Sequence, residues 1–402
     1  MTKPSVGCLG ALFSIGMVLV AGPTPLMNPA WAAVPHRVGA TRFAAAHSSG
    51  LNQVVRFEPA ATYAVGSGPL SVALVDLNRD GRDDVVIGTG STGDPRNDHR
   101  LFVFLQGLNG ALGRPQRLHT DGGDGSTMRL ATGDLNGDGL PDLAVSVATG
   151  VDLFYDGLSG LSAPTLIPMP SLVLQVVVAD VNHDGVADLV VDSVSGVSVL
   201  LGSGGGFGQS STITTTVQSE IKVADVTGDG LPDVIGFTQS AVHVFRQLAD
   251  GSFVLHDYDL QSHWFPAAID IGDVTGDGRL DVVMARGGNR PTSALDVFVQ
   301  TPGGRLAPPV VERSYDIPGA IVAADVTGDG LDDVVVAHNG WEDIGVYCQL
   351  SDGSLGQEHL FPLPWSNGYD ALGVAVGDVS GDGKADILIA DPDNGLLLLR
   401  QA

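Results

Sequence analysis

The sequence predicts an all-β protein, a seven-bladed β-propeller of four-stranded antiparallel blades closed by an N-terminal strand. Three observations lead to this fold. A nine-residue motif rich in Asp and Gly occurs seven times. Short, β-branched runs bounded by turn residues flank every copy, which is typical of strands. No stretch shows convincing helical periodicity. Four short strands in each of several similar repeats are characteristic of propeller blades.

The motif copies are separated by 58, 46, 45, 48, 52 and 53 residues along the 402-residue chain. An apolar run such as Val176–Ala179 comes before each copy, and a second run such as Val85–Ile87 follows it. A third run and a weaker fourth one come next, as in Val197–Leu200 and Phe253–Leu255. We therefore predict one propeller domain over residues 53–402, with each motif joining the first two strands of a blade. The copies begin at Asp76, Asp134, Asp180, Asp225, Asp273, Asp325 and Asp378.

The two ends of the chain predict how the ring closes. After the seventh motif only two strand-like runs remain, Ile387–Ala390 and Leu396–Arg400, so the last blade lacks an outer strand. A spare extended segment, Gln53–Val65, precedes the first motif. An open ring would leave unpaired strand edges, which favour aggregation. We therefore expect the N-terminal segment to complete the seventh blade.

The motif has the chemistry of a loop that binds a hard cation. In the second copy, Asp134–Asp142, oxygen-bearing side chains occupy positions one, three, five and nine, and glycine occupies position six. Ca²⁺ takes six to eight oxygen ligands, and glycine permits the sharp turn that brings them together. Asp and Gly are also ordinary turn residues, so loops without metal are the alternative. Against that alternative, 21 clustered carboxylates without cations would repel one another.

We predict up to seven Ca²⁺ ions, held by the side chains at positions one, three, five and nine and by the main-chain carbonyl of position seven. The third position is Asn in the first three loops, Thr in the next three and Ser in the last, so we expect the later sites to be weaker. In the third loop, His183 replaces the usual glycine. The predicted ligands are Asp76, Asn78, Asp80, Arg82 and Asp84; Asp134, Asn136, Asp138, Leu140 and Asp142; Asp180, Asn182, Asp184, Val186 and Asp188; Asp225, Thr227, Asp229, Leu231 and Asp233; Asp273, Thr275, Asp277, Arg279 and Asp281; Asp325, Thr327, Asp329, Leu331 and Asp333; Asp378, Ser380, Asp382, Lys384 and Asp386.

The N-terminal residues 1–32 resemble a secretory signal peptide. Lys3 gives a small positive region, Val6–Ala21 is apolar, and Ala30–Ala32 is a small-x-small cleavage site. An uncleaved membrane anchor is the alternative. We expect residues 33–52 to be a flexible segment and the protein to be secreted, extracellular or periplasmic. Cleavage would leave Cys348 as the one cysteine, so bound metal rather than a disulfide would stabilise the fold.

The charge of the chain excludes several kinds of partner. Asp and Glu outnumber Lys and Arg by 46 to 20, which gives a net charge of −26. Such a protein is not expected to bind nucleic acid or an anionic membrane. No segment after the signal is long and apolar enough to span a bilayer. We expect a monomer that binds an extracellular glycan or protein.

The tryptophans indicate where a ligand would bind. In an antiparallel blade the metal loops lie on one face of the disc, and the turns between the second and third strands lie on the other. The connections between blades lie on that second face too, so Trp264, Trp341 and Trp365 all fall there. Exposed aromatic rings beside polar side chains suit stacking on sugar rings. Packing between blades, as structural wedges, is the alternative. The predicted ligand-binding residues are Trp264, Trp341, Trp365 and Tyr369.

The sequence Asp-Val-Asn/Thr-Gly-Asp-Gly-x-x-Asp followed by a valine-rich strand resembles the FG-GAP, or VCBS, repeat. This repeat forms the calcium-bearing propeller of integrin α-subunits and of many secreted bacterial proteins. A fungal seven-bladed lectin and some polysaccharide-degrading proteins are similar. The resemblance covers residues 53 to 400 and implies Ca²⁺ in the loops. It is poor evidence for one function, because different sites are built on the same fold.

We interpret the chain as a binding or adhesion module, with carbohydrate as the leading ligand class. The alternatives are an extracellular polysaccharide-active enzyme, such as a lyase or hydrolase, and a protein-interaction scaffold. An enzyme is the less favoured reading, because no H-E-x-x-H, C-x-x-C or G-x-S-x-G motif is present. Cys348 lies in an apolar run and is expected to be a buried structural thiol.

Overall fold

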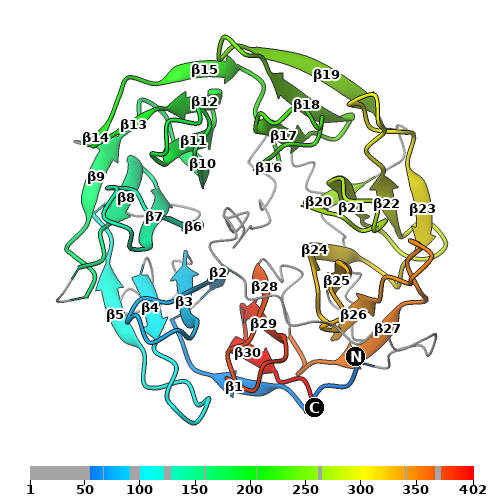
Figure 1. Ribbon diagram of the computed structural model, residues 1–402. Coiled ribbons are helices and arrows are strands. Elements are labelled where there is room, and N and C mark those ends of the chain that lie inside the picture. Colours follow the sequence, from blue (N-terminus) through cyan, green and yellow to red (C-terminus); the bar gives the residue numbers. More distant parts are fainter. Residues whose placement is uncertain are drawn as a thin grey trace, which may run out of the picture.

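Seven four-stranded antiparallel sheets surround a central axis in the computed structural model (Figure 1). The structure describes residues 55–66, 68–90, 100–121, 128–157, 160–204, 206–260, 265–339, 342–366 and 373–402. These residues contain strands and turns but no α-helix, which confirms the predicted all-β propeller. None of them forms a helix that is long and apolar enough to cross a membrane. The predicted signal peptide and the segment 33–52 lie outside the described residues.

Each sheet is one blade, and its strands follow one another from the inner strand to the rim. Blades 1 to 3 are β2 (Pro69–Val75), β3 (Asp84–Thr89), β4 (Arg100–Phe104) and β5 (Gln116–His119); β6 (Leu130–Gly133), β7 (Asp142–Val147), β8 (Gly150–Phe154) and β9 (Thr165–Pro168); β10 (Val173–Ala179), β11 (Asp188–Ser193), β12 (Gly196–Leu200) and β15 (Ser211–Thr214). Blades 4 to 6 are β16 (Glu220–Ala224), β17 (Asp233–Phe237), β18 (Ala241–Gln247) and β19 (Phe253–Asp259); β20 (Pro266–Gly272), β21 (Asp281–Arg286), β22 (Ala294–Phe298) and β23 (Val310–Arg313); β24 (Pro318–Ala324), β25 (Asp333–His338), β26 (Asp343–Tyr347) and β27 (His359–Pro362).

Blade 7 combines both ends of the described chain. Its inner three strands are β28 (Gly373–Gly377), β29 (Asp386–Asp391) and β30 (Gly395–Leu399), and its outer strand is β1 (Ala61–Tyr63). β1 runs antiparallel to β30, with Thr62 opposite Leu397. A small additional hairpin, β13 (Gly202–Ser203) with β14 (Gly206–Phe207), lies between the last two strands of blade 3. No sequence pattern predicted this hairpin.

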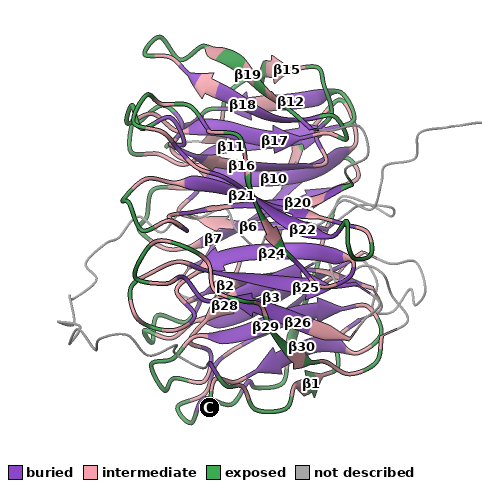
Figure 2. Ribbon diagram, turned by 90° about the vertical axis from the view of Figure 1, so that its right-hand side faces the viewer, coloured by how far each residue is buried: buried purple, intermediate pink, exposed green. Residues whose placement is uncertain are grey.

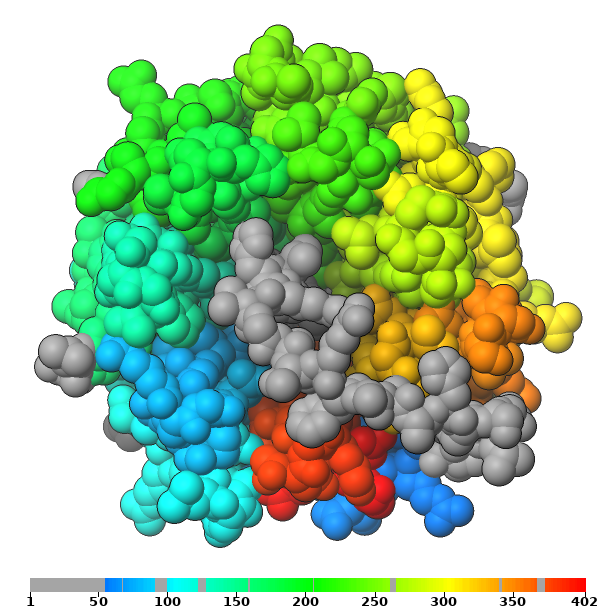
Figure 3. Space-filling model, viewed as in Figure 1, coloured from blue at the N-terminus to red at the C-terminus, as the bar shows by residue number. Residues whose placement is uncertain are grey.

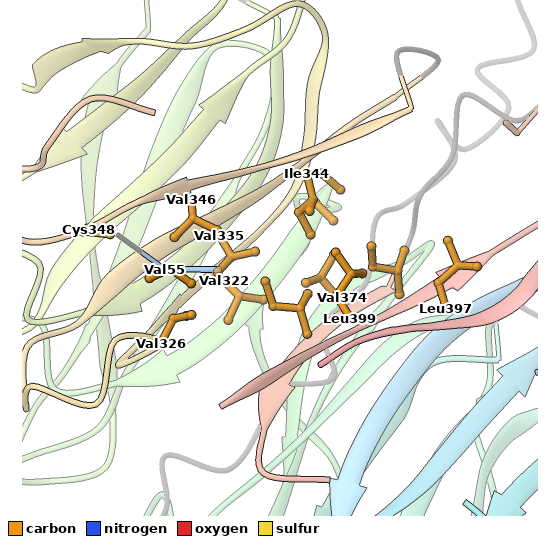
Figure 4. Packing of buried hydrophobic residues seen from close by; sticks show 14 residues of the cluster. Val55, Val322, Val326, Val335, Ile344, Val346, Cys348, Val374, Leu397 and Leu399 are labelled. Carbon is orange, nitrogen blue, oxygen red and sulfur yellow. The ribbon is translucent and has the colours of Figure 1, made fainter. Parts of the chain in front are cut away.

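The hydrophobic core is divided among the seven seams between neighbouring blades. Each of the seven clusters of buried apolar residues combines side chains from two adjacent blades. Figure 4 shows the cluster between blades 6 and 7, where Val335 and Val346 meet Val374 and Leu399. A blade inside the ring is covered on both sides, so its middle strands are apolar at nearly every position. β3, β7 and β25, for example, are buried along their whole length.

Burial is highest in the strands and lowest in the connections. Figure 2 shows buried residues along the strands and exposed residues at the turns on both faces of the disc. Figure 3 shows the blades as separate groups of atoms that follow the sequence around the ring. The ring thus presents two sets of turns to solvent, and a candidate site has to be sought among them.

Candidate metal loops and the opposite face

All seven motif copies join the first two strands of a blade, as predicted. The ninth residue of each motif begins the second strand, where it lies opposite the last residue of the first strand. In blade 2 this pair is Gly133 and Asp142, and in blade 6 it is Ala324 and Asp333. The seven loops therefore lie on one face of the disc, because equivalent hairpins have the same orientation in every blade.

The first carboxylate organises each loop by accepting main-chain hydrogen bonds. In blade 2, Asp134 accepts the N–H of Gly137 at 2.7 Å through Oδ1 and the N–H of Gly139 at 2.8 Å through Oδ2. The bond to the sixth-position glycine occurs in all seven loops, at 2.8–2.9 Å. That glycine has a positive φ in every copy, for example +82° at Gly139. The glycine is therefore required by the turn.

The fourth position also has a left-handed backbone conformation, including in the two loops that lack glycine there. Arg79 has φ of 61° and His183 has φ of 57°, close to the 77° of Gly137. The sequence singled out His183 but not Arg79. Both residues keep the turn geometry, although the left-handed backbone conformation is less favourable for them than for glycine.

The ninth carboxylate is buried and accepts hydrogen bonds from both the loop and the end of the third strand. Asp142 is 0% exposed; its Oδ1 accepts the N–H of Asp156 at 2.7 Å and its Oδ2 accepts the N–H of Leu135 at 2.9 Å. The bond to the end of the third strand occurs in all seven blades, at 2.7–3.0 Å. Burial raises the pKa of Asp142 to about 6, and the carboxylates of Asp138 and Asp134 contribute to the shift. This residue thus has a structural role independent of any metal.

The donor chemistry of the loops fits a hard cation. Carboxylate, amide and carbonyl oxygens are the ligands that Ca²⁺ prefers, and an ionised carboxylate has about four acceptor sites. The Thr327 hydroxyl oxygen is buried without a hydrogen-bond partner, as a neutral ligand position would be. No group of three or more His, Cys, Asp or Glu side chains in the described residues is arranged to hold a metal ion. The predicted ligand sets of the seven loops therefore remain predictions.

The loops differ in whether a basic side chain already pairs with the fifth-position carboxylate. Arg82 pairs with Asp80 in the first loop, and Arg279 pairs with Asp277 in the fifth. In the fourth loop, Arg246 donates from Nε and Nη2 to Asp229 Oδ2 at 3.0 and 2.8 Å. An arginine on this carboxylate would compete with a cation. This difference between loops was not predicted from the third-position residues.

A glutamine at the end of the third strand links a blade to the loop of the preceding blade. Gln247 donates to the carbonyl of Val181 at 2.9 Å, and Gln349 donates to the carbonyl of Asp273 at 3.1 Å. Gln401 makes the same contact with the carbonyl of Val326 at 2.9 Å. The sequence pattern did not reveal this role, although a glutamine recurs at the end of the third-strand run. The face that carries the motif loops therefore also holds hydrogen bonds between neighbouring blades.

On the opposite face, Trp365 is the predicted ligand-binding residue that the structure describes. Its side chain is 64% exposed, so it is not a buried wedge between blades. Its carbonyl accepts a hydrogen bond from Asn394 Nδ2 at 2.9 Å, and the neighbouring Ser366 hydroxyl donates to Asp393 at 3.2 Å. Asn394 also donates to Asp391 at 3.2 Å. Trp365 thus lies beside a polar turn of blade 7.

The other predicted aromatic residues of this face are Trp264, Trp341 and Tyr369, and all three lie outside the described residues. Phe265, which follows Trp264, is 63% exposed. Two of the polar residues near Trp341 are buried, since His338 is 3% exposed and Asn339 is 5% exposed, whereas Glu342 and Asp343 are partly exposed. His338 and Asn339 are therefore not free for a ligand. They belong to the packing between blades instead.

Cys348 is buried, as predicted, in the cluster between blades 6 and 7. Burial raises the pKa of its thiol to about 12, with the nearby Asp333 adding to the effect. A thiolate is the nucleophilic form of cysteine. Cys348 therefore acts as a packing residue rather than as a nucleophile.

The comparisons with known proteins agree with this architecture. The FG-GAP-like repeat matches residues 76–145, 225–284 and 293–389. A chain from the mercury-soaked structure of BBS1N in complex with ARL6DN has a TM-score of 0.59 and 16% identity, over 88% of this chain and 98% of that chain. The structure of an Agrocybe aegerita lectin that recognises non-reducing terminal N-acetylglucosamine has a TM-score of 0.53 and 19% identity, over 82% of this chain and 93% of that chain. Identities this low show the fold alone, whereas the repeat covers more than half of the sequence. The chain therefore belongs to the family of FG-GAP-like repeat proteins.

Proposed function

We propose that this protein is a secreted, calcium-stabilised propeller that binds carbohydrate on the face opposite its metal loops. The observation that carries the proposal is the exposed ring of Trp365 beside the polar turn in which Asp393 is exposed and Asn394 is partly exposed, with the buried Asp391 holding the turn. An aromatic ring stacks on the apolar face of a sugar, while carboxylate and amide groups bind its hydroxyls. The similar lectin recognises N-acetylglucosamine, and glycan binding by this chain is inferred from Trp365.

In this proposal the loops bind Ca²⁺ through positions one, three, five, seven and nine. The ion would neutralise the three carboxylates of a loop and hold its oxygens at one centre. The ninth residue already links the loop to the third strand, so metal binding would stabilise the blade as a whole. The described residues contain one cysteine, which is free, so bound metal would stabilise a secreted fold in place of a disulfide. Export itself is proposed from the pattern of residues 1–32.

The ion pairs made by the fifth-position carboxylates change the expected order of calcium affinity among the loops. We infer that the second, third and sixth loops bind Ca²⁺ most tightly, because their seventh residues are Leu140, Val186 and Leu331. The first and fifth loops carry Arg82 and Arg279 at that position, and each pairs with the carboxylate that a cation needs. In the fourth loop, Arg246 has the same effect from the third strand.

A glycan array tests the binding function with matched aromatic variants. The wild-type protein, Trp365→Ala and Phe265→Ala are screened with Ca²⁺ and with a chelator. Trp365→Ala is expected to lose about 30-fold or more in affinity for the bound glycan, since a central aromatic contact is worth about 2 kcal/mol or more. Phe265→Ala controls for the loss of any exposed ring from the same face. Unchanged glycan binding by a well-folded Trp365→Ala protein contradicts the proposal.

A protein ligand is the second candidate, because the rim carries exposed apolar side chains. Val254 and Leu255 on β19 are 43% and 45% exposed, and Val310 and Val311 on β23 are 53% exposed each. Apolar patches on a soluble protein often mark protein interaction sites. This candidate predicts that binding to a partner survives Trp365→Ala and is lost on substitution of these rim residues by Ser.

A further inference from the structure

The imidazole of His338 is enclosed at the seam between blades 5 and 6. His338 is the last residue of β25, and its side chain is 0% exposed. Nδ1 lies 3.1 Å from the carbonyl oxygen of Asp316, in the connection from blade 5 to blade 6. Nε2 lies 2.7 Å from Glu358 Oε1, in the same blade. The ring of Tyr315 packs edge-on against the imidazole, with 5.6 Å between centroids.

Both partners of the ring are hydrogen-bond acceptors. A main-chain carbonyl oxygen only accepts, and an ionised carboxylate only accepts. A neutral imidazole has one N–H donor, so it can satisfy one of the two contacts. An imidazolium has two N–H donors and satisfies both. The other oxygen of Glu358 accepts the Tyr315 N–H at 2.7 Å, so the carboxyl group contacts both the ring and the connection that precedes blade 6.

The fold leaves space for this arrangement at Gly345. A Cβ on Gly345 would lie 2.2 Å from Glu358 Oε1, so any other residue would displace the carboxylate. The φ of Gly345 is not in the left-handed region, so the reason for glycine here is the carboxylate that crosses β26. The pair of His338 and Glu358 is therefore built into the strand sequence of blade 6.

The pair is connected to the turns of the proposed ligand face. Asp316, whose carbonyl contacts His338, uses its carboxylate to bind Arg290 Nε at 3.2 Å and Nη2 at 3.3 Å. The Arg290 guanidinium lies 4.3 Å from the centroid of the Tyr315 ring. Glu358 directly precedes β27, and the chain continues from β27 to the exposed Trp365. Movement of Glu358 would therefore affect the strand that leads to Trp365.

We propose that His338 is held as an imidazolium whose two N–H groups lock β25 to the connection from blade 5, directly through the Asp316 carbonyl and indirectly through Glu358, and that loss of its proton releases this lock beneath the ligand face. The lock is complete while the ring is charged, because both N–H groups then donate. It is lost as the pH rises, because a neutral ring has one N–H group and can bond only one of the two acceptors. The charged and titratable side chains that surround the ring are Glu358, Asp316, Asp343, Tyr315, Tyr347 and Arg290.

The charge state is tested by ¹⁵N NMR of the histidine-labelled full-length protein at neutral pH. Both ring nitrogens of His338 are expected to carry protons in the wild-type protein. In Glu358→Gln the side-chain amide can donate to Nε2, so the ring is expected to become neutral with its proton on Nδ1. A neutral ring in the wild-type protein, or an identical charge state in the two proteins, overturns the proposal. His338→Gln assigns the signal.

The release is tested by hydrogen exchange at Tyr315, whose N–H is bound by Glu358. When the pH is raised until the ring loses its proton, protection of this amide is expected to fall about tenfold relative to Gly287. The Gly287 N–H donates to the Phe265 carbonyl at 2.7 Å and has no contact with the pair. His338→Gln can donate to Glu358 but cannot titrate, so its ratio is expected to stay constant. Equal pH dependence in both proteins contradicts the lock, whether or not the protein binds glycans.

Discussion

Gly110 of blade 1 lies so close to Ser380 of blade 7 that a Cβ on Gly110 would be 1.8 Å from the Ser380 carbonyl oxygen. The two residues are 270 positions apart in the sequence, yet they meet where the first blade contacts the last. Arg400, also of blade 7, donates from Nη2 to the carbonyl of Gly110 at 2.9 Å, so blade 7 contacts this turn of blade 1 at two points. Gly304 and Gly353 make equivalent close approaches to Thr227 and Thr275. The turn between the third and fourth strands of a blade thus contacts the motif loop of the preceding blade.

Substitution of Gly110 by Ala tests this contact. Ala would incur both the left-handed backbone, at φ of +70°, and the clash with Ser380. We expect a loss of about 2–5 kcal/mol in the free energy of unfolding, about 1–2 from the backbone and about 1–3 from overpacking. Gly251→Ala is the matched control, since Gly251 has φ of +80° and no atom within 4 Å of its Cβ position. Equal destabilisation by the two variants in urea denaturation would show that the seam contact is unimportant.

The ninth and fifth carboxylates of a loop are predicted to respond differently to calcium. Asp333 accepts the N–H groups of Val326, Thr327 and Gln349 at 2.8–2.9 Å and is 0% exposed. Asp333→Ala would leave these donors unpaired, at about 1–3 kcal/mol for each one that stays buried. We expect it to lower the melting temperature with or without a chelator.

Asp329, at the fifth position of the same loop, serves as the control. It accepts the N–H of Leu331 at 3.0 Å and is partly exposed. We expect Asp329→Ala to lower the melting temperature mainly when Ca²⁺ is present, because its principal role would be as a ligand. Thermal denaturation in Ca²⁺ and in chelator separates the two roles. If the two variants behave alike under both conditions, the structural role assigned to the ninth position is wrong.

Removal of a competing arginine is predicted to strengthen one metal site. Arg246 pairs with Asp229 at 2.8 Å, and both side chains are partly exposed. An exposed ion pair is worth about 0.2–1 kcal/mol, so Arg246→Leu is expected to raise calcium affinity of the fourth loop up to about fivefold. Calorimetric titration with Ca²⁺ measures this change. Arg305→Leu controls for the loss of one positive charge nearby, and an equal gain in that variant would point to net charge rather than competition.

A buried charge network on the inner strands predicts a pH dependence of stability. Glu220 accepts the Ile269 N–H at 3.0 Å and pairs with Lys222, which also contacts Asp270 at 2.9 Å. Burial raises the pKa of Glu220 from 4.5 to about 7, although Lys222 opposes the shift. The folded protein then binds a proton that the unfolded chain releases. Stability from this group is therefore full below about pH 4.5 and is lost as the pH rises to about 7.

Glu220→Gln keeps the acceptor and removes the titration. We expect the free energy of unfolding of the wild-type protein to fall by up to about 1.4 kcal/mol per pH unit relative to the variant across this window. Urea denaturation of both proteins at matched pH values measures the difference. A constant difference between the two proteins would show that Glu220 does not titrate there.

The repeat pattern was sufficient to predict the number of blades and the place of each motif. The ninth-position Asp and the sixth-position Gly are local requirements of one hairpin, so they recur with the hairpin and are visible in the sequence. The partners of Gln247 and Gln349 belong to another blade, so no spacing rule reveals them. The ion pair between Arg246 and Asp229 could not be predicted for a similar reason, because Arg246 lies on the third strand and not in the loop.

Strand patterning and turn chemistry are short-range properties, so the all-β class, the seven repeats and the oxygen-rich loops could be predicted from the sequence. The burial and the contacts of the polar residues depend on the tertiary structure. His338 ends strand β25 and Trp365 lies in the connection after β27, yet the ring of His338 is enclosed by Asp316 and Glu358 while Trp365 is exposed. The difference depends on the packing of neighbouring blades, which brings together residues that are remote in the chain.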